Sequence, residues 1–293
     1  MATFRAPAAQ AAYIMKALQG HHLRSVGTVR NYEQGLTRVA EWTQRERLPG
    51  GLRAMTPELA IRYLEQRGQE VGQKALDMER QAMQAMRQHV TGQLAHGARI
   101  PVIKSEQAQV LTARAYTAPQ VALIAAAQTP RHGLATELAY AAGLRAHELL
   151  TLRRGEERAA DPRPALASKW QGRNGVIYTV HGKGGLVREV LLPHALAERL
   201  EAVRLDAPLA ITDRGIHYQS HYDIGGGQRW SNSVSAASER ALGWSTGAHG
   251  LRHSYAQERM AELQASLSRD AALTTVSQEM GHFRPEITET YLR

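Results

Sequence analysis

Six side chains in four separate segments could together act on a phosphate group. They are two guanidiniums, one ammonium, two imidazoles and a phenol: Arg145, Arg252, Lys183, His249, His282 and Tyr291. Fixed arginines can stabilise the negative charge that builds on the non-bridging oxygens during attack at phosphorus. A phenol, with an ordinary pKa of about 10, needs a base or a cationic field to become a nucleophile. The departing sugar hydroxyl needs a proton. Because the set contains no acid, it is suited to a phosphodiester.

The first two segments also allow purely structural interpretations. Residues 139–154, AYAAGLRAHELLTLRR, place Arg145 at a bend where Gly143 ends a helix. The guanidinium needs an anion or an acid partner, and Glu148, three residues on, could be that partner. Lys183 stands between two glycines at a turn, where glycine allows close approach to a ligand. Most loop lysines are only solvated, so Lys183 alone predicts little.

The third segment, HGLRHSYA at residues 249–256, carries two histidines four residues apart. His249 and His253 could bind a metal ion, but the zincin pattern needs Glu after the first histidine, and Gly250 stands there. The charge of Arg252 between the histidines would also oppose a cation. A phosphate suits this cluster better, because the guanidinium fork matches its oxygens. We therefore expect no metal site.

The fourth segment, MGHFRPEITETYLR at residues 280–293, places His282 nine residues before Tyr291. A lone tyrosine near a C-terminus is usually a packing residue, so the combination of segments matters more than any one. In their order and local context the four segments resemble the tyrosine recombinase family, which includes phage integrases. The matching stretches are GLRAHELLTL, HGKGGLVREV, HGLRH and GHFRPEITETY. The resemblance covers about residues 117–293 strongly and the N-terminal region more loosely.

The resemblance implies how the reaction would proceed. Tyr291 would attack the scissile phosphate, forming a 3′-phosphotyrosyl link and freeing a 5′-hydroxyl. Lys183 would protonate the leaving oxygen, and His249 would accept or donate a proton near the nucleophile.

The remaining side chains would hold the phosphate in place. By resemblance, Arg145 and Arg252 would clamp the non-bridging oxygens, and His282 would hydrogen-bond the phosphate. Glu148 would brace the first motif and His253 the third. One phosphodiester is exchanged for another of similar energy, so no ATP is needed. The arginines do the electrostatic work that metals do elsewhere, so no divalent ion or other cofactor is expected.

The implied partner is double-stranded DNA, which the two domains would grip from opposite sides. Strand exchange between two sites implies a homo-tetramer on DNA, and the chain could be a monomer without DNA. A role in a phage or another mobile element is an expectation within the family. Three features depart from the family pattern, the first being a stretch between Arg252 and His282 that is longer than usual. Members commonly continue into a tail that docks on a neighbouring subunit, and here two residues follow Tyr291. The Gly-rich stretch SHYDIGGGQRW at residues 220–230 is unexplained.

Other functions are compatible with parts of the pattern. A type IB topoisomerase shares the phosphotyrosine chemistry and would relax supercoiled DNA without recombination. A catalytically silent DNA-binding or architectural protein would keep the fold, although the intact six-residue set argues against it. A metal-dependent hydrolase is a remote third interpretation, which indifference to a chelator would exclude.

The composition favours a polyanionic partner. The formal net charge is +9 and the sequence pI is about 10.0, which points to nucleic acid before a membrane surface. Residues 1–115 contain 16 Lys and Arg against 9 Asp and Glu, so this part should attract a polyanion more strongly than residues 116–293. The absence of cysteine excludes disulfides and fits a reducing compartment. No stretch approaches the roughly 18 apolar residues of a membrane span, and the N-terminal residues lack a signal-peptide core. We expect a cytoplasmic protein.

Helices are predicted throughout the first hundred residues. Thr28 is expected to cap a helix whose apolar positions extend to Trp42. Thr56 followed by Pro57 is a helix start, with a capping hydroxyl and then Pro at the first helical position. A third helix is predicted from Gln73 to about Leu94.

The helical pattern breaks between Gly97 and Ala115, around Pro101. We therefore predict an all-α core-binding domain at residues 1–97, a linker at residues 98–115 and a catalytic domain at residues 116–293.

The second domain is predicted to be α+β, mainly helical with a small β-hairpin or sheet. Thr117 is expected to cap one helix, and another is expected from about Gly133 to Ala142. In residues 175–192 the spacing of the apolar residues changes from helical to strand-like. This change predicts a β-hairpin around the Gly-rich turn that contains Lys183.

Overall fold

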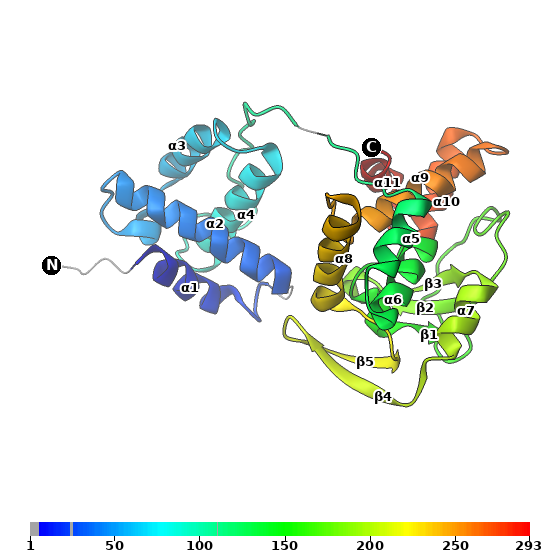
Figure 1. Cartoon of the computed structure of the whole chain (residues 1–293). Helices are drawn as coiled ribbons and strands as arrows, with labels where there is room; N and C mark the ends of the chain where they lie inside the picture. Colours follow the sequence, from blue (N-terminus) through cyan, green and yellow to red (C-terminus); the bar gives the residue numbers. More distant parts are fainter. Residues whose placement is uncertain (1–5, 24–25, 110) are drawn as a thin grey trace. The chain divides into compact units, whose positions relative to one another are not determined.

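The chain forms two compact units, residues 1–110 and 111–293, which are described separately (Figure 1). The structure, a computed structural model, describes residues 6–23, 26–109 and 111–293.

The division between the units falls inside the expected linker at residues 98–115, of which residue 110 lies outside the described residues. The start of that segment packs on the first unit. Ile100 is buried in the core of this unit, and the Ser105 hydroxyl donates a hydrogen bond of 2.7 Å to the Val71 carbonyl. The stretch that belongs to neither core is therefore shorter than the predicted linker.

Four helices account for most of the first unit. They are α1 (Pro7–Leu18), α2 (Val26–Arg45), α3 (Pro57–Gly68) and α4 (Gln73–His89). Each helix directs apolar side chains into one shared core, which includes Leu36, Trp42 and Met83. This burial of one apolar side per helix is what the helical spacing in the sequence predicts.

The predicted helix starts and ends in this unit are partly confirmed. Thr56 caps α3, its hydroxyl accepting a hydrogen bond of 3.3 Å from the amide three residues on. The prediction for Thr28 is wrong, because α2 begins two residues earlier and Thr28 lies inside it. The predicted end of α4 is also wrong. The helix stops at His89, and Gly92, with φ of 64°, then turns the chain in a left-handed conformation.

The second unit combines helices with two small antiparallel sheets, so the expected mainly helical class with a small sheet is confirmed for it (Figure 1). Its helices are α5 (Ala118–Ala126), α6 (Pro130–Ala142), α7 (His194–Glu201), α8 (Gly227–Leu242), α9 (Gly250–Gln264), α10 (Arg269–Glu279) and α11 (Pro285–Thr288). Its strands are β1 (Arg153–Arg154), β2 (Val176–His181), β3 (Val187–Leu192), β4 (Arg204–Asp213) and β5 (Ile216–Tyr222).

The predicted hairpin and helix caps in this unit are confirmed. β2 and β3 pair antiparallel across the Gly-rich turn, and β1 adds a short third strand beside β2. Thr117 caps α5 in a reciprocal arrangement with Gln120, whose side chain accepts from the Thr117 amide at 2.9 Å. α6 begins at Pro130, three residues before the expected Gly133.

The second sheet, β4 with β5, was not predicted. Its first strand contains Pro208, which argues against a strand in the sequence because proline cannot donate to the ladder. The pairing skips this position, since the register shifts between Arg204 and Leu209. The unexplained Gly-rich stretch at residues 220–230 proves to contain the end of β5 and the start of α8.

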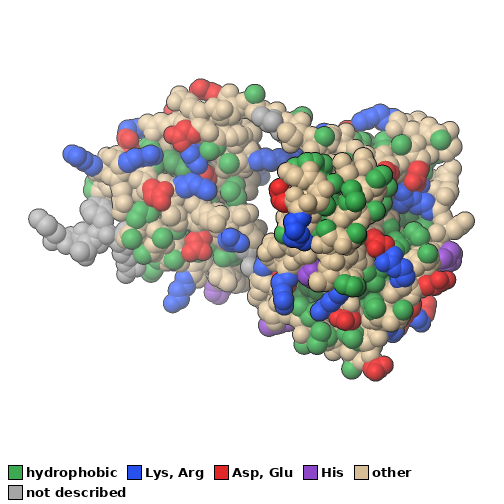
Figure 2. Space-filling view, viewed as in Figure 1, with side chains coloured by type: hydrophobic (Ala, Val, Ile, Leu, Met, Phe, Trp, Pro, Cys, Tyr) green, Lys and Arg blue, Asp and Glu red, His purple; other side chains and the backbone are tan. Residues whose placement is uncertain are grey.

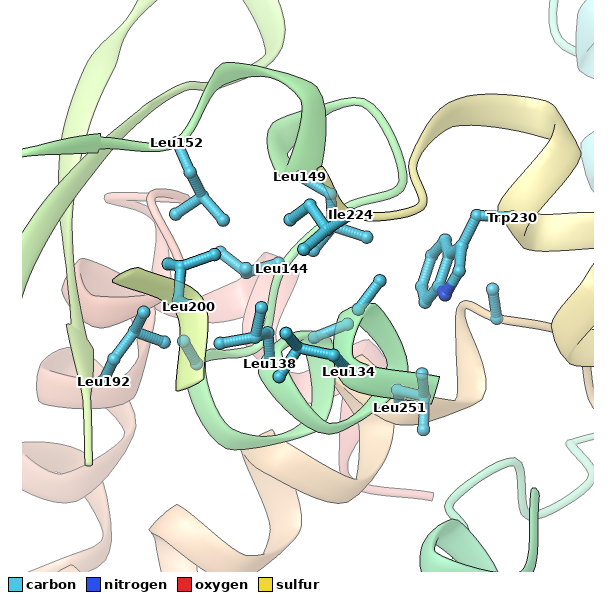
Figure 3. Close-up of a cluster of buried hydrophobic side chains, with 14 of the residues drawn as sticks. Leu134, Leu138, Leu144, Leu149, Leu152, Leu192, Leu200, Ile224, Trp230 and Leu251 are labelled. Carbon is cyan, nitrogen blue, oxygen red and sulfur yellow. The ribbon is translucent and has the colours of Figure 1, made fainter. Parts of the chain in front are cut away.

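The larger of two hydrophobic cores in the described part of the second unit is shown in Figure 3, and the smaller one, between α9 and α10, includes Tyr291. Leu134 and Leu138 of α6 point into the larger core, opposite Leu200 of α7 and Trp230 of α8. The Trp230 indole donates a hydrogen bond of 3.1 Å to the Thr136 hydroxyl, so its polar atom is satisfied. α6 is therefore the central helix, and its C-terminal end is held rigidly where the first motif begins.

Basic side chains are spread over the surface of both units on the face shown in Figure 2, with acidic ones among them. In the described part of the chain, every helix is too short or too polar to cross a membrane.

Candidate active site

The end of α6 presents the first arginine of the set. Gly143 closes the helix in a left-handed conformation, with φ of 58° and ψ of 41°. A Cβ atom at this position would lie 2.8 Å from the Tyr255 ring, so only glycine fits. The chain then turns, and Arg145 follows at the surface of the core, with 19% of its side chain exposed.

Glu148 is the acidic centre of this site and is completely buried. It accepts from the Arg145 guanidinium at 2.7 Å and from the Arg188 guanidinium at 2.7 Å, while Arg252 lies 3.9 Å away. Burial alone would raise the pKa of Glu148, but the charges of Arg188, Arg145 and Arg252 outweigh it and hold this pKa far below its usual range. One carboxylate thus faces three guanidiniums, which leaves a surplus of positive charge.

Arg252 is completely buried and fixed by neutral groups. Its Nη1 donates to the Gly143 carbonyl, and its Nη2 lies 3.3 Å from the Met280 carbonyl and 3.1 Å from Nε2 of His282. Its Nε has no hydrogen-bond partner among the described residues. Burial, and then the charge of Arg145, lowers the pKa of Arg252 to about 10, so it stays protonated at neutral pH. Its charge is offset only by Glu148, 3.9 Å away, a carboxylate that Arg145 and Arg188 also contact.

Tyr291 lies directly against this cation. The Cζ atom of Arg252 is 5.5 Å from the centroid of the Tyr291 ring. Three imidazoles surround the same ring, with centroid separations of 5.3 Å for His249, 4.9 Å for His253 and 5.1 Å for His282. Tyr291 is 7% exposed, and Gln257 of α9 donates to its carbonyl at 3.1 Å. Segments far apart in the sequence therefore converge on the terminal phenol.

The imidazoles are neutral at physiological pH. Burial, followed by the charge of Arg252, lowers the pKa of His282 to about 3. Burial, followed by the charge of Arg114, lowers the pKa of His253 to about 4. The pKa of His249 is lowered in the same direction by partial burial of its ring and then by Arg252, although the residue as a whole is exposed. Each ring therefore has one unprotonated nitrogen, which is a hydrogen-bond acceptor.

The contacts of His282 define its tautomer. Arg252 can only donate, so Nε2 of His282 accepts from it and Nδ1 carries the ring proton. Nδ1 lies 3.1 Å from the hydroxyl of Thr288, which is buried in α11. His282 is thus oriented from both sides.

Lys183 is not brought into contact with the other five side chains. It is exposed in the turn at Lys183–Gly185, and within the described part of the chain no hydrogen bond or ion pair ties it to the cluster. The base of the turn does reach the site, since a Cβ atom at Gly182 would lie 3.6 Å from the Glu148 carboxylate. The structure therefore places Lys183 one residue beyond the cluster.

The metal interpretation of the third segment gains nothing from the geometry. The rings of His249 and His253 are 5.7 Å apart, centroid to centroid, and nearly perpendicular. Among the residues described, no three His, Asp or Glu side chains are grouped so that they could hold a metal ion.

Two buried charges at the site were missed in the sequence. Arg188 donates to Glu148 and, at 2.7 Å, to the Glu279 carbonyl. The signal for it was present, because Arg188 lies two and four residues before Val190 and Leu192 and so shares the buried side of β3 with them. Glu279 accepts from Arg259 of α9 at 2.9 Å and so ties α10 to α9 just before His282. No local pattern in the sequence pointed to Glu279.

Comparisons with known proteins agree with this architecture. Neither a protein-family model nor a curated protein matches the sequence. Three solved structures resemble the chain: the XerH site-specific recombinase bound to its palindromic difH substrate, a lambda integrase tetramer bound to a Holliday junction, and the Tn1549 transposon integrase in complex with transposon right end DNA.

The similarity extends over nearly the whole chain at low sequence identity. XerH has a TM-score of 0.57 at 14% identity, covering 99% of this chain and 94% of its own. For lambda integrase the TM-score is 0.59 at 16% identity, with 97% and 76% covered. For the Tn1549 integrase it is 0.55 at 12% identity, with 99% and 95% covered. The chain therefore has the fold of the tyrosine recombinases and integrases.

Proposed function

We propose that the chain cuts and rejoins DNA, with Tyr291 as the nucleophile that forms a 3′-phosphotyrosyl intermediate. One observation carries the proposal: the Tyr291 ring lies 5.5 Å from the buried Arg252 guanidinium, in a site where three guanidiniums share one carboxylate. This surplus of positive charge suits an anionic phosphate. The fold shared with site-specific recombinases and integrases supports the same function.

In the proposed reaction, the Tyr291 oxygen bonds to phosphorus and the bond from phosphorus to the 5′ oxygen breaks. The phenol proton passes to a neutral imidazole, for which His249 is the candidate. Burial of the ring and then the charge of Arg252 lower the pKa of His249, and the phosphate would offset the second of these, so the ring becomes a better base once DNA is bound. Arg145 and Arg252 stabilise the charge on the non-bridging oxygens. His282 positions Arg252, from which its Nε2 accepts, rather than bonding the phosphate itself as the family resemblance implies.

Lys183 is the proposed donor of the proton that the 5′ oxygen receives. Its exposed position on the hairpin turn suits this role, because the leaving strand would lie over the turn rather than inside the buried cluster. Rejoining is the reverse path, in which a 5′-hydroxyl attacks the phosphotyrosine and the energy of the bond is conserved. The proposed reaction uses no cofactor.

We extend the proposal to the domains and the assembly. Residues 116–293 would be the catalytic domain and residues 1–97 a core-binding domain that grips the duplex, with residues 98–115 between them. The high basic charge of residues 1–115 supports the DNA-binding role of the first domain. The lambda integrase tetramer on a Holliday junction supports a homo-tetramer on DNA as the active assembly here.

A nicked suicide duplex tests the proposed reaction. After cleavage next to a nick, a short 5′-hydroxyl fragment diffuses away, so the covalent protein–DNA complex accumulates and is visible on a denaturing gel. The wild-type chain should be trapped, and Tyr291→Phe should not be. Tyr140→Phe is the matched control, because it removes another phenol hydroxyl of the same unit, one that donates to Glu258.

The outcomes separate the proposal from its alternatives. Trapping of Tyr291→Phe, or no trapping of the wild type on any duplex that it binds, would refute a Tyr291 nucleophile. Relaxation of supercoiled plasmid without any recombinant product would favour the topoisomerase interpretation. Cleavage that disappears on adding a chelator would favour a metal-dependent hydrolase.

A further inference from the structure

A second basic pocket lies in the catalytic unit, outside the six-residue set. It has a volume of about 370 Å³ and lies between the three-stranded sheet and β5. Its basic lining residues are Arg153, Arg158, His181 and His217. None of its described lining residues is acidic, and the others are neutral, Tyr218 and Gln219 among them. We call it the Arg153 pocket.

Arg158 is held in this pocket by neutral acceptors. Its Nε donates to the Thr179 hydroxyl at 3.0 Å, and its Nη2 donates to the carbonyls of Thr151 and Thr179, both at 2.6 Å. These contacts fix the guanidinium but do not neutralise it. Burial, and then the charge of Arg153, lowers the pKa of Arg158 to about 10, so the side chain remains a cation. Its Nη1 is left without a partner among the described residues, available to a ligand.

Arg153 adds a second charge without a counter-ion. The residue is half-buried on β1, and within the described part of the chain its side chain makes no ion pair. The carboxylates nearest in sequence are engaged elsewhere. Glu156 pairs with Arg154, Glu157 pairs with Arg204, and Asp161 accepts from the amide of Val187 at 2.9 Å. Two neighbouring guanidiniums without a carboxylate are costly unless an anion joins them.

The pocket is connected to the active site through one residue. The Thr151 hydroxyl donates to the Glu148 carbonyl at 2.9 Å and accepts from the His181 amide at 3.0 Å. The Thr151 carbonyl accepts from Arg158. The turn at Glu148–Thr151 therefore contributes Glu148 to the active site and Thr151 to the lining of the Arg153 pocket.

We propose that the Arg153 pocket binds a phosphate diester of the DNA backbone other than the one that Tyr291 attacks. The inference rests on the proposed function, from which DNA is taken as the ligand. Paired guanidiniums match phosphate oxygens, and the volume exceeds that of a single phosphate and leaves room for the attached sugar. The pocket would set the register of the duplex, so that the scissile phosphate falls between Arg145 and Arg252.

Salt-dependent binding to duplex DNA tests the pocket. The assay uses chains that also carry Tyr291→Phe, so that binding is measured without cleavage. Arg153→Gln should weaken binding and make the slope of log K against log salt shallower by about one, as expected for one lost phosphate contact. Arg153→Lys should keep most of the slope. Arg240→Gln, on the exposed side of α8, is the matched control and should leave the slope unchanged.

A set of duplexes with one methylphosphonate each identifies the phosphate. The uncharged linkage should weaken binding at one position away from the scissile phosphate, and Arg153→Gln should abolish that effect at this position only. If Arg153→Gln and Arg240→Gln behave alike, no such pocket contact exists. If inorganic phosphate at constant ionic strength binds through Arg153 while the DNA slope stays unchanged, the pocket holds a free anion and the inference is wrong.

Two further measurements distinguish failure of this inference from failure of the proposed function. His217→Gln removes an exposed ring from the same pocket and should reduce the effect of the same methylphosphonate even if Arg153→Gln does not fold. Trapping of the wild type on the suicide duplex is scored separately. If the wild type is trapped but the Arg153 variants bind normally, only this inference fails. If the wild type is never trapped, the proposed function fails whatever the slopes are.

Discussion

Replacing Glu148 by glutamine tests the electrostatic design of the site most directly. The substitution preserves shape but removes the one charge that three guanidiniums share. Arg188 and Arg252 are 4% and 0% exposed, so water cannot replace the lost carboxylate. Breaking a buried ion pair on one side costs about 3–5 kcal/mol. We therefore expect Glu148→Gln to lower the free energy of unfolding of the second unit by at least about 3 kcal/mol.

Urea denaturation followed by tryptophan fluorescence measures this loss. Three of the four tryptophans, Trp170, Trp230 and Trp244, lie in the second unit, so the signal reports mainly on it. With a slope near 2 kcal/mol per molar urea, the midpoint should fall by about 1.5 M. Glu137→Gln, which breaks a pair with Arg199 at the surface, is the control and should cost less than about 1 kcal/mol. An equally small loss for Glu148→Gln would refute the account of one carboxylate neutralising the cluster.

Two further predictions concern the histidines and the turn after α6. His253 and His282 have folded pKa values of about 4 and about 3, below the ordinary 6.5, so the unfolded chain binds their protons first as pH falls. Stability should therefore be complete above about pH 6.5 and fall by about 2 kcal/mol per ring between pH 6.5 and 5. His253→Gln should remove the share of one ring, about 2 kcal/mol, from this dependence in urea midpoints measured across that range, and an unchanged pH profile would contradict the assignment. Gly143→Ala should lower the rate of covalent trapping at least tenfold, because its Cβ would lie 2.8 Å from a buried ring at φ of 58°. Gly243→Ala has φ of 78° and open space around it, so it should bring only the backbone strain of about 1 kcal/mol and an unchanged trapping rate.

The sequence predicted those helix ends and turns that depend on residues close together in the chain. Thr56 and Thr117 cap helices because the hydroxyl and the amide that it accepts from lie three residues apart. Gly143 ends α6 because only glycine takes the left-handed turn without strain. The β2–β3 hairpin follows from a change in period around a Gly-rich turn.

Contacts between distant segments could not be predicted in the same way. Arg188 meets Glu148 across 40 residues, and no spacing rule connects a strand position to a buried carboxylate in a turn. No strand was predicted at β4, where Pro208 argues against one, and the register shift that accommodates this proline is a property of the paired hairpin. Of the side chains that the four motifs name, Arg252, His249 and His282 lie around Tyr291, whereas Lys183 stands apart from them.

The separation of Lys183 has a consequence for how the two proton transfers are controlled. The phenol of Tyr291 and the ring of His253 are buried and that of His282 is half-buried, whereas the Lys183 amine that would serve the leaving oxygen is exposed on a glycine-flanked turn. Under the proposed chemistry, Tyr291 and the side chains around it are in place before DNA binds. The proton donor Lys183 reaches its position only when a duplex contacts the hairpin turn. A phosphodiester that reached the tyrosine by chance would find no acid in position, and its cleavage would stall before the strand could leave.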